Sequence, residues 1–242
     1  MIQKINQPLA SYQSELLSNH TDILHFFSTR ENGADKIEEL SELLTIPLDN
    51  IVITQQTHGA NVRIITPANK AEIHVDTDAL ATKHRGICIT IKTADCTPVL
   101  LFDPKQKAVA AIHSGWRGTV QNIAEKTINV LKQQFHSKPE NIIAAIGPSI
   151  GQENYEVGPE VVEQFQKLFP VVSSVLDFSG CPVGKAKLNV RHALLQQLLN
   201  AGLNLLNIDM TNLCTFNEAS VFYSARREGA NTGRMINGIL LK

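Results

Sequence analysis

Cysteine is scarce in this sequence, and no two cysteines form a C-x-x-C motif. The 242 residues include only Cys88, Cys96, Cys181 and Cys214, which are spread widely along the chain. A secreted disulfide scaffold shows a much denser pattern. We therefore expect all of these cysteines to be free thiols.

An excess of charge and a long apolar run are also absent. The chain has 22 basic and 23 acidic residues without a basic run, so it offers no electrostatic footprint for nucleic acid or an anionic membrane. No segment approaches the roughly 20 apolar residues that span a bilayer, and the opening MIQKINQPLASYQSELLSNH lacks the apolar centre of a signal peptide. The sequence predicts a cytoplasmic protein, and it leaves open both small neutral or mildly anionic ligands and the oligomeric state.

What the chain does contain is material for a core, because 43% of its residues are hydrophobic. No repeat, low-complexity tract or linker divides it, so residues 1–242 are predicted to form one domain. Period-2 and apolar runs bounded by turn residues predict strands, and apolar positions at helical spacing predict helices. The expected strands lie in NIVITQQTHG, DALATKHRGICITIKTADC, PVLLFDPKQKAVAAIHSGW, NIIAAIGPSIG and the tail ASVFYSARREGANTGRMINGILL, and the expected helices in GPEVVEQFQKLF and VRHALLQQLLNAGL. The architecture is therefore expected to be mixed α and β.

A further helix is predicted directly after the segment IHSGWRG. From Val120 to Leu131 the apolar positions fall near helical spacing, so GTVQNIAEKTINVLKQQF is expected to start a helix after Gly118 with Thr119 as its N-cap. A strand then leads into a helix just after His113.

One cysteine and two histidines lie where expected strands run into loops. His58, Cys96 and His113 occupy such positions, and side chains at strand ends can converge on a cavity. Two imidazoles and a thiolate suit zinc, whose catalytic sites keep a fourth position free. Spacing alone favours the ordinary interpretation, a small buried thiol and solvated histidines.

Five short blocks change that balance, because they occur together and in order. QQTHG, TADCTPVLL, IHSGWRG, IGPSIG with YEVG, and FYSARREGANTGR resemble the signature blocks of the laccase-domain family of purine nucleoside phosphorylases, formerly known as multicopper polyphenol oxidases. The matches run from about Thr29 to Arg234. The resemblance implies a metal site, usually zinc, formed by His58, Cys96 and His113.

The same resemblance implies a fold and an activity. The fold is a layered α/β/β/α sandwich with mixed sheets, similar to the cysteine deamidase domain of a bacterial toxin. The activity is phosphorolysis of adenosine, inosine and methylthioadenosine to the base and a sugar 1-phosphate, with additional deamination of adenosine. The implied ligands are purine nucleosides and phosphate.

Arginines in the matching blocks are candidates for phosphate binding, because the planar guanidinium fits phosphate oxygens. Arg30, Arg117 and Arg226 are the candidates, and Arg117 is favoured because GWRGT leads into an expected helix start, where free backbone N–H groups attract anions. The Arg30 block lacks the family's paired glycines, and Ala225 replaces a tyrosine before Arg226. The alternative for each arginine is a solvated surface group. Trp116, the only tryptophan, could stack on a base or pack beside the helix.

Carboxylates near the expected ligands could orient a ligand or transfer protons. Asp95, next to Cys96, is the candidate for a catalytic role. Asp76 and Asp78 in HVDTDALAT have the same chemistry available to them. Turn formation is the alternative for all of them, because aspartate side chains bond to nearby backbone.

Other functions remain open at this point. Cys96 could be the nucleophile of a cysteine hydrolase or amidase, with His113 as its base and no metal, and peptidoglycan precursor editing is included in that alternative. Copper could replace zinc at the three ligands. A copper-dependent polyphenol oxidase is the least favoured alternative, because the eight histidines include no H-x-H pair and a full laccase site cannot be assembled. Metal content distinguishes the zinc-dependent nucleoside enzyme from the cysteine hydrolase.

Overall fold

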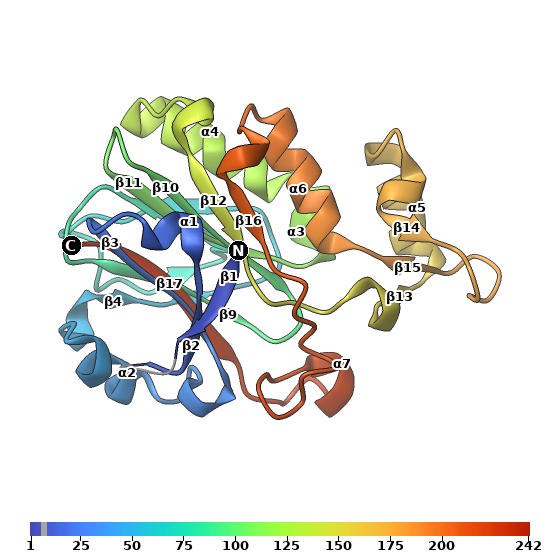
Figure 1. Ribbon diagram of the computed structural model, residues 1–242, viewed down its shortest axis with the longest axis horizontal. Helices are drawn as coiled ribbons and strands as arrows, with labels where there is room; N and C mark the ends of the chain where they lie inside the picture. Colours follow the sequence, from blue (N-terminus) through green and yellow to red (C-terminus); the bar gives the residue numbers. More distant parts are fainter. Residues whose placement is uncertain (6–8) are drawn as a thin grey trace.

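Two six-stranded sheets stack on each other in the computed structural model, which describes residues 1–5 and 9–242 (Figure 1). The first sheet has the order β1 (Ile2–Ile5), β2 (Ser11–Ser14), β3 (Ile23–Ser28), β17 (Met235–Leu241), β9 (Cys88–Thr93) and β4 (Ile51–Val52). The second has the order β16 (Ile208–Met210), β12 (Ile143–Ile146), β10 (Thr97–Asp103), β11 (Ala108–Ser114), β8 (Ala79–Thr82) and β6 (Val62–Ile64). Both sheets are mixed, since β4 pairs in parallel with β9, and β6 and β16 pair in parallel with β8 and β12.

Smaller elements surround these sheets. Two further sheets join β13 (Glu156–Val157), β15 (Ala186–Leu188) and β14 (Leu176–Asp177), and β5 (Thr54–Gln55) with β7 (His74–Val75). The helices are α1 (Glu15–Ser18), α2 (Ile37–Leu44), α3 (Trp116–Val120), α4 (Ile123–Phe135), α5 (Pro159–Leu168), α6 (Val190–Asn200) and α7 (Ala225–Glu228). None of the helices within the described residues is long and apolar enough to cross a membrane.

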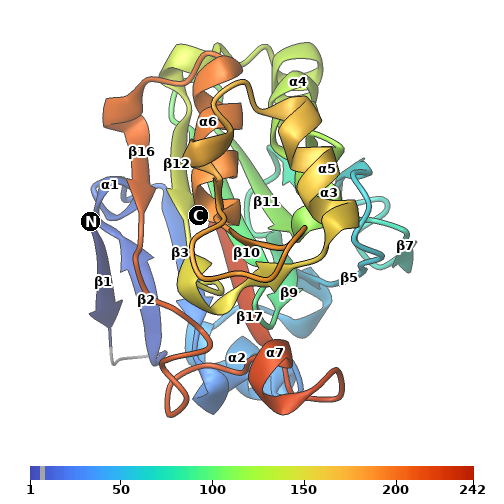
Figure 2. The ribbon, with the colours of Figure 1, turned by 90° about the vertical axis from the view of Figure 1, so that its right-hand side faces the viewer.

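Three apolar cores account for the layers. In β10, Leu100 and Phe102 face the first sheet, whereas Val99 and Leu101 face the helices, so every residue of this strand is buried. Such burial on both faces gives a continuous apolar run rather than alternation. The third core joins the outer face of the first sheet to α2. The order of layers is helix, sheet, sheet, helix (Figures 1 and 2), so the predicted α/β/β/α sandwich is confirmed.

Several expected elements differ from the structure. The helix expected from Thr119 is two helices, α3 and α4, and it starts earlier, with Gly115 as the N-cap. Thr119 lies inside α3, where its hydroxyl donates to the carbonyl of Gly115 at 3.0 Å. Asn122, with a φ of 58°, separates the two helices. The chain therefore forms two helices where its apolar spacing predicts one.

The expected strands also divide or shrink. The run DALATKHRGICITIKTADC forms β8 and β9, which belong to different sheets, and NIVITQQTHG forms the short strands β4 and β5. The tail expected to be rich in strands forms turns, the short helix α7 and then β17. All four cysteines are free, as predicted.

His25 in β3 gives the fold a predicted pH dependence. Its side chain is 3% exposed, and its Nε2 accepts the backbone N–H of Ser14 at 2.9 Å. Burial lowers the pKa of His25 from 6.5 to about 4, and the charge of Asp209 opposes this shift. His25 takes up a proton at a higher pH in the unfolded chain than in the folded chain. Stability is therefore lost as the pH falls from the pKa of His25 in the unfolded chain toward its pKa in the folded chain.

We expect this single group to lower the free energy of unfolding by about 2 kcal/mol between about pH 7.5 and about pH 5. Urea unfolding of wild-type and His25→Gln protein, both in chelator, measures the difference, because glutamine keeps an acceptor for Ser14 but does not titrate. The same pH dependence in both proteins would contradict the assignment to His25.

Candidate functional site

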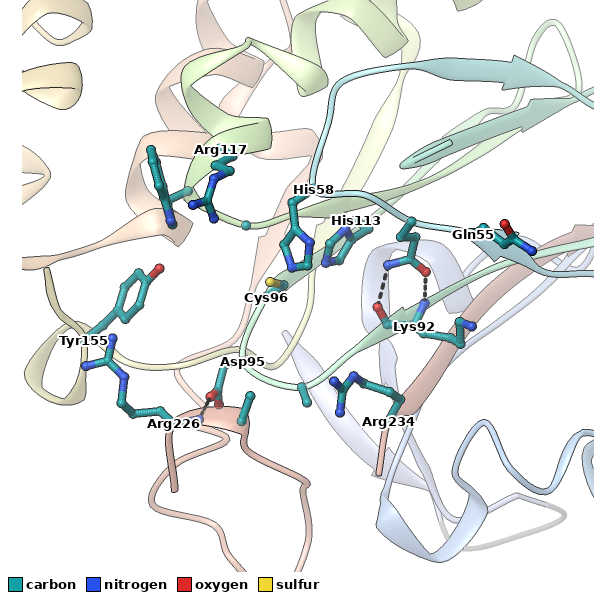
Figure 3. A pocket seen from close by; sticks show the side chains of 15 residues that line it. Gln55, His58, Lys92, Asp95, Cys96, His113, Arg117, Tyr155, Arg226 and Arg234 are labelled. Atoms are coloured by element: carbon teal, nitrogen blue, oxygen red, sulfur yellow. Dashed lines mark hydrogen bonds between the residues drawn. The ribbon is translucent and has the colours of Figure 1, made fainter. Parts of the chain in front are cut away.

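The three expected metal ligands meet at one end of the stacked sheets. His58 follows β5, Cys96 lies between β9 and β10, and His113 is near the end of β11. Their ligand atoms all lie within 4.8 Å of one another, and the two imidazole centroids are 4.9 Å apart at 76°. Figure 3 shows both rings beside the sulfur. The structure thus brings together residues that are far apart in sequence.

The backbone around these ligands is locally constrained. His58 and Asp95 have φ values of 62° and 84°, in the left-handed region that residues with a Cβ seldom occupy. A Cβ on Gly115 would lie 3.0 Å from the sulfur of Cys96 and 3.2 Å from Cδ2 of His58. The glycine before Trp116 therefore allows the start of α3 to approach the ligand set closely.

Asp78 holds both histidines in place. Its fully buried carboxylate is 2.8 Å from Nδ1 of His113. It also accepts the backbone N–H groups of Thr57, His58 and Gly59 at 3.1, 3.0 and 2.9 Å. A carboxylate on Nδ1 fixes the imidazole so that Nε2 is available to a ligand. Of the two aspartates in HVDTDALAT, Asp78 is therefore the one that supports the site.

The charges of the three groups depend on one another. Burial raises the pKa of Cys96, but the charge and hydrogen bonds of His113 and His58 outweigh it and lower this pKa to about 6. Burial lowers the pKa of His113, but the Cys96 thiolate and Asp78 raise it to about 9. For Asp78, burial is outweighed by His113 and the backbone donors, which lower its pKa to about 2. Without metal, the neutral-pH form is a thiolate beside an imidazolium.

These residues fit a metal ion of intermediate softness. The donors are two imidazole nitrogens and a sulfur that is already ionised near neutral pH, a set suited to zinc or copper and not to magnesium or calcium. Asp78 supplies the outer carboxylate that metal-bound histidines commonly have. Three protein ligands also leave a coordination position for a substrate or water.

A cavity of about 570 Å³ opens over the ligand set. This volume is within the range of small-molecule sites. It is lined by Gln55, Gln56, His58, Lys92, Ala94, Asp95, Cys96, His113, Gly115, Trp116, Arg117, Tyr155, Ala225, Arg226 and Arg234. Most of its charged side chains are cationic, so the cavity favours an anionic or hydrogen-bonding ligand.

Two of the expected arginines line this cavity. The guanidinium of Arg117 lies 4.4 Å from the centroid of Trp116, and that of Arg226 lies 5.1 Å from the centroid of Tyr155. Stacking on an aromatic face restrains a guanidinium and leaves its edges to donate hydrogen bonds. Nη1 of Arg226 already donates to the backbone carbonyl of Glu156 at 3.1 Å, and its other N–H groups remain for a ligand. Neither arginine forms an ion pair with a carboxylate of the described chain. Both are placed to bind an anion.

The third expected arginine lies elsewhere. Arg30 is absent from the residues that line the cavity. Its guanidinium lies 4.8 Å from the centroid of Tyr223, pairs with Glu228 at 3.4 Å and donates to the carbonyl of Ala219. The structure therefore does not bring Arg30 to the expected phosphate site, and its contacts tie the N-terminal segment to the loop before α7.

Asp95 lines the cavity, but its two oxygens are already occupied. One accepts the hydroxyl of Thr215 at 2.6 Å, and the other accepts the hydroxyl of Ser224 at 3.0 Å and the backbone N–H of Arg226 at 2.7 Å. These bonds fasten the segment that carries Arg226 to the loop that carries Cys96. The geometry supports a positioning role more directly than the proton transfer expected from sequence.

Sequence reasoning missed other lining residues. Tyr155 belongs to the YEVG block and supports Arg226, while Lys92 and Arg234 add cations at the other end of the cavity. Lys92 did leave a signal, because it is the one charged residue in the apolar run ICITIKT. Trp116 is half-buried and has both of the surroundings expected for it, since it packs against the core and lines the cavity.

The fold and the donor set define a class of proteins: layered α/β proteins with a His–Cys–His group that can hold a metal ion in a cationic cavity. A family model described as multi-copper polyphenol oxidoreductase laccase matches residues 21–242. The chain belongs to this laccase-domain family, which confirms the resemblance found in its sequence blocks.

Individual relatives carry enzyme names. The chain is 35% identical to a protein of Bacteroides thetaiotaomicron named purine nucleoside phosphorylase, over 94% of each chain. It is 37% identical to adenosine deaminase RL5 from an unknown prokaryotic organism, over 87% of this chain and 84% of the relative.

Solved structures agree with the fold. The hypothetical protein YfiH of Bacillus licheniformis superposes with a TM-score of 0.91 at 25% identity, covering 100% of this chain and 99% of that one. YlmD from Geobacillus stearothermophilus superposes with a TM-score of 0.90 at 26% identity, covering 100% and 98%.

Proposed function

We propose that this chain is a purine nucleoside phosphorylase that also deaminates adenosine, with zinc bound by His58, Cys96 and His113. Its substrates would be adenosine, inosine, methylthioadenosine and phosphate. The observation that carries the proposal is the placement of a metal-binding donor set and two stacked guanidinium groups in one cavity. The names of relatives that align with most of the chain support it.

In phosphorolysis, the bond between C1′ of the ribose and the purine breaks as a phosphate oxygen bonds to C1′. Arg117 and Arg226 would bind and orient the phosphate through charge-assisted hydrogen bonds. When bound, zinc supplies Lewis acidity beside Cys96, which also suits the attack of water on a purine carbon in deamination. Asp95 holds the two sides of the cavity together, and Asp78 holds the histidines.

The setting of this activity is part of the proposal. Free thiols fit a reducing compartment, so we propose a cytoplasmic location, with residues 1–242 acting as one catalytic domain.

Product analysis tests the proposed activity: adenosine with phosphate should give adenine and ribose 1-phosphate, and adenosine alone should give inosine and ammonia. Absence of both product pairs from zinc-loaded protein would contradict the proposed function.

A cysteine hydrolase is the second candidate, and a specific arrangement favours it. Cys96, His113 and Asp78 form a series of thiolate, imidazolium and carboxylate, which is the order found in cysteine nucleophiles with a supported base. The His58 ring beside the sulfur favours metal binding instead, because a nucleophile needs only one base. Elemental analysis distinguishes the two candidates and also separates zinc from copper.

Replacement of Arg117 by alanine should depress phosphorolysis far more than deamination. Only phosphorolysis has to hold a phosphate, and one lost charge-assisted hydrogen bond corresponds to about a tenfold to hundredfold loss of kcat/KM. Initial rates with adenosine, measured separately for adenine and inosine, give both activities from one protein.

The matched control is Lys126→Ala, which removes an exposed cation from α4 without touching the cavity. Arg117→Lys keeps the charge but not the planar fork, so it should recover only part of the loss. If Arg117→Ala lowers both activities equally, Arg117 serves the fold or the nucleoside, and its assignment to phosphate is wrong.

A further inference from the structure

The cavity has a second cationic end that the proposed chemistry does not use. Lys92 and Arg234 line it on the side of the His58–Cys96–His113 set opposite to Arg117 and Arg226 (Figure 3). Inorganic phosphate bound by the two stacked arginines would leave these other cations without a counter-charge. Their presence in a small-molecule cavity therefore calls for a second anionic group.

Sheet pairing places Lys92 and Arg234 close together. β9 and β17 are antiparallel with Ile236 opposite Lys92 and Met235 opposite Thr93, and Arg234 comes directly before β17. The two cations are therefore diagonal neighbours on one face of the first sheet, a relation that places Cα atoms about 7–8 Å apart, within reach of long side chains. They can both contact one phosphate-sized group.

Neither of these charges is neutralised by a carboxylate of the residues that the structure describes. In the described ranges the bonds of Lys92 to side chains involve only its backbone groups, and no carboxylate or other acceptor contacts its Nζ. Arg234 donates to the backbone carbonyls of Ala230 at 2.8 Å, Gly233 at 3.1 Å and Thr232. These bonds hold the guanidinium in place without cancelling its charge, so part of the cost of ordering it is met before a ligand binds.

The surrounding residues reinforce this end as a donor site. Gln56 bonds to both backbone groups of Lys92, donating to its carbonyl at 2.8 Å and accepting its N–H at 2.7 Å, so the strand end is fixed. Asp95 is the one carboxylate among the lining residues, and its oxygens are occupied by Thr215, Ser224 and Arg226. No carboxylate of the lining is thus available to Lys92.

We infer that Lys92 and Arg234 form a subsite for a phosphate monoester carried by the substrate, and that the chain accepts nucleoside 5′-monophosphates. The inference rests on the proposed function, in which Arg117 and Arg226 bind the attacking phosphate. In-line attack at C1′ of a β-nucleoside brings that phosphate to the ring face opposite the base. The 5′ carbon lies on the same face as the base, so a 5′-phosphate points away from the attacking phosphate, toward the second cationic end.

The reaction balances with the two substrates alone. The bond between C1′ and N9 of the purine breaks, and its electron pair leaves with the purine, which takes up one proton. An oxygen of inorganic phosphate bonds to C1′ as that bond breaks. Adenosine 5′-monophosphate would yield adenine and ribose 1,5-bisphosphate.

Binding of adenosine, 5′-AMP and 3′-AMP by the zinc-loaded protein, measured by titration calorimetry at fixed salt, tests the inference. We expect 5′-AMP to bind about tenfold to hundredfold more tightly than adenosine, the range of one or two charge-assisted hydrogen bonds. We also expect 3′-AMP to lack most of this gain. The affinity ratio of 5′-AMP to adenosine should fall about tenfold in Lys92→Met, which keeps the length of the side chain.

Two variants control for folding and overall charge. Lys92→Arg should retain the preference for 5′-AMP, and Lys132→Met, which removes an exposed cation from α4, should leave the ratio unchanged. Equal affinities for adenosine and 5′-AMP would overturn the inference. The inference would also be wrong if Lys92→Met weakened the binding of inorganic phosphate but left the affinity ratio of 5′-AMP to adenosine unchanged, because Lys92 would then serve the attacking phosphate.

The binding ratio is independent of turnover, which separates the two proposals. A protein that cleaves adenosine but shows no preference for 5′-AMP would retain the proposed function and lose this subsite. A protein that prefers 5′-AMP but cleaves no nucleoside would retain the subsite and lose the proposed function.

Discussion

Replacement of Cys96 by serine should reduce bound zinc from about one equivalent to a small fraction of one. The sulfur is the strongest of the three donors because it is ionised near neutral pH, where a serine hydroxyl is not. Two imidazoles alone make a much weaker site. Elemental analysis after gel filtration measures the loss, and phosphorolysis should fall with the metal.

Cys181→Ser is the matched control, because Cys181 is a half-buried free thiol outside the cavity. It should keep its full zinc content. Retention of zinc with unchanged coordination spectra in Cys96→Ser would contradict the ligand assignment.

Alkylation of Cys96 independently tests whether its sulfur is bound to zinc or is a free thiolate. In zinc-loaded protein the sulfur is shielded, so iodoacetamide should label it slowly, and a chelator should make labelling fast because a thiolate with a pKa of about 6 is then exposed. Mass mapping identifies the labelled cysteine. Rapid labelling of Cys96 in protein with a full zinc complement would favour the cysteine hydrolase.

The sandwich could be predicted in outline because its signals are local. The apolar run PVLLF of β10 reflects burial on both faces, and the amphipathic helices reflect burial on one. The break between α3 and α4 has no such signal. Gln197 of α6 donates to the carbonyl of Thr119 at 2.7 Å and to the side-chain oxygen of Asn122 at 2.9 Å, so a side chain distant in sequence stabilises the break.

The site shows the same limit. His58, Cys96 and His113 stand in short recognisable blocks and meet in the structure, whereas Arg30 stands in a similar block and does not line the cavity. A block indicates position along the chain but not the direction of a side chain. The role of Asp78 depends on the pairing of β8 with β11, in which its carbonyl accepts the N–H of His113 at 2.8 Å. Local sequence gives only a turn-forming aspartate.

Replacement of Asp78 by asparagine should weaken zinc binding about tenfold to hundredfold, the range found for outer carboxylates of metal-bound histidines. One oxygen of Asp78 faces His113 and the N–H of His58, and the other faces the N–H groups of Thr57 and Gly59. Asparagine has a single acceptor oxygen, so in either orientation its NH₂ group points at backbone donors. Each buried donor left without a partner costs about 1–3 kcal/mol of stability.

Asp76→Asn is a close control for this prediction. Asp76 is two residues away and exposed, and its carboxylate bonds to Thr57 and Asn61 but not to His113. Zinc affinity, measured by competition with a chromophoric chelator, should stay near the wild-type value in Asp76→Asn and fall in Asp78→Asn. Asp78→Asn also removes the charge that keeps Nδ1 of His113 protonated. The pH dependence of zinc binding should therefore change in this variant. Equal zinc affinity in the two variants would show that the ligand set is organised without Asp78, and that the three backbone bonds serve only the turn.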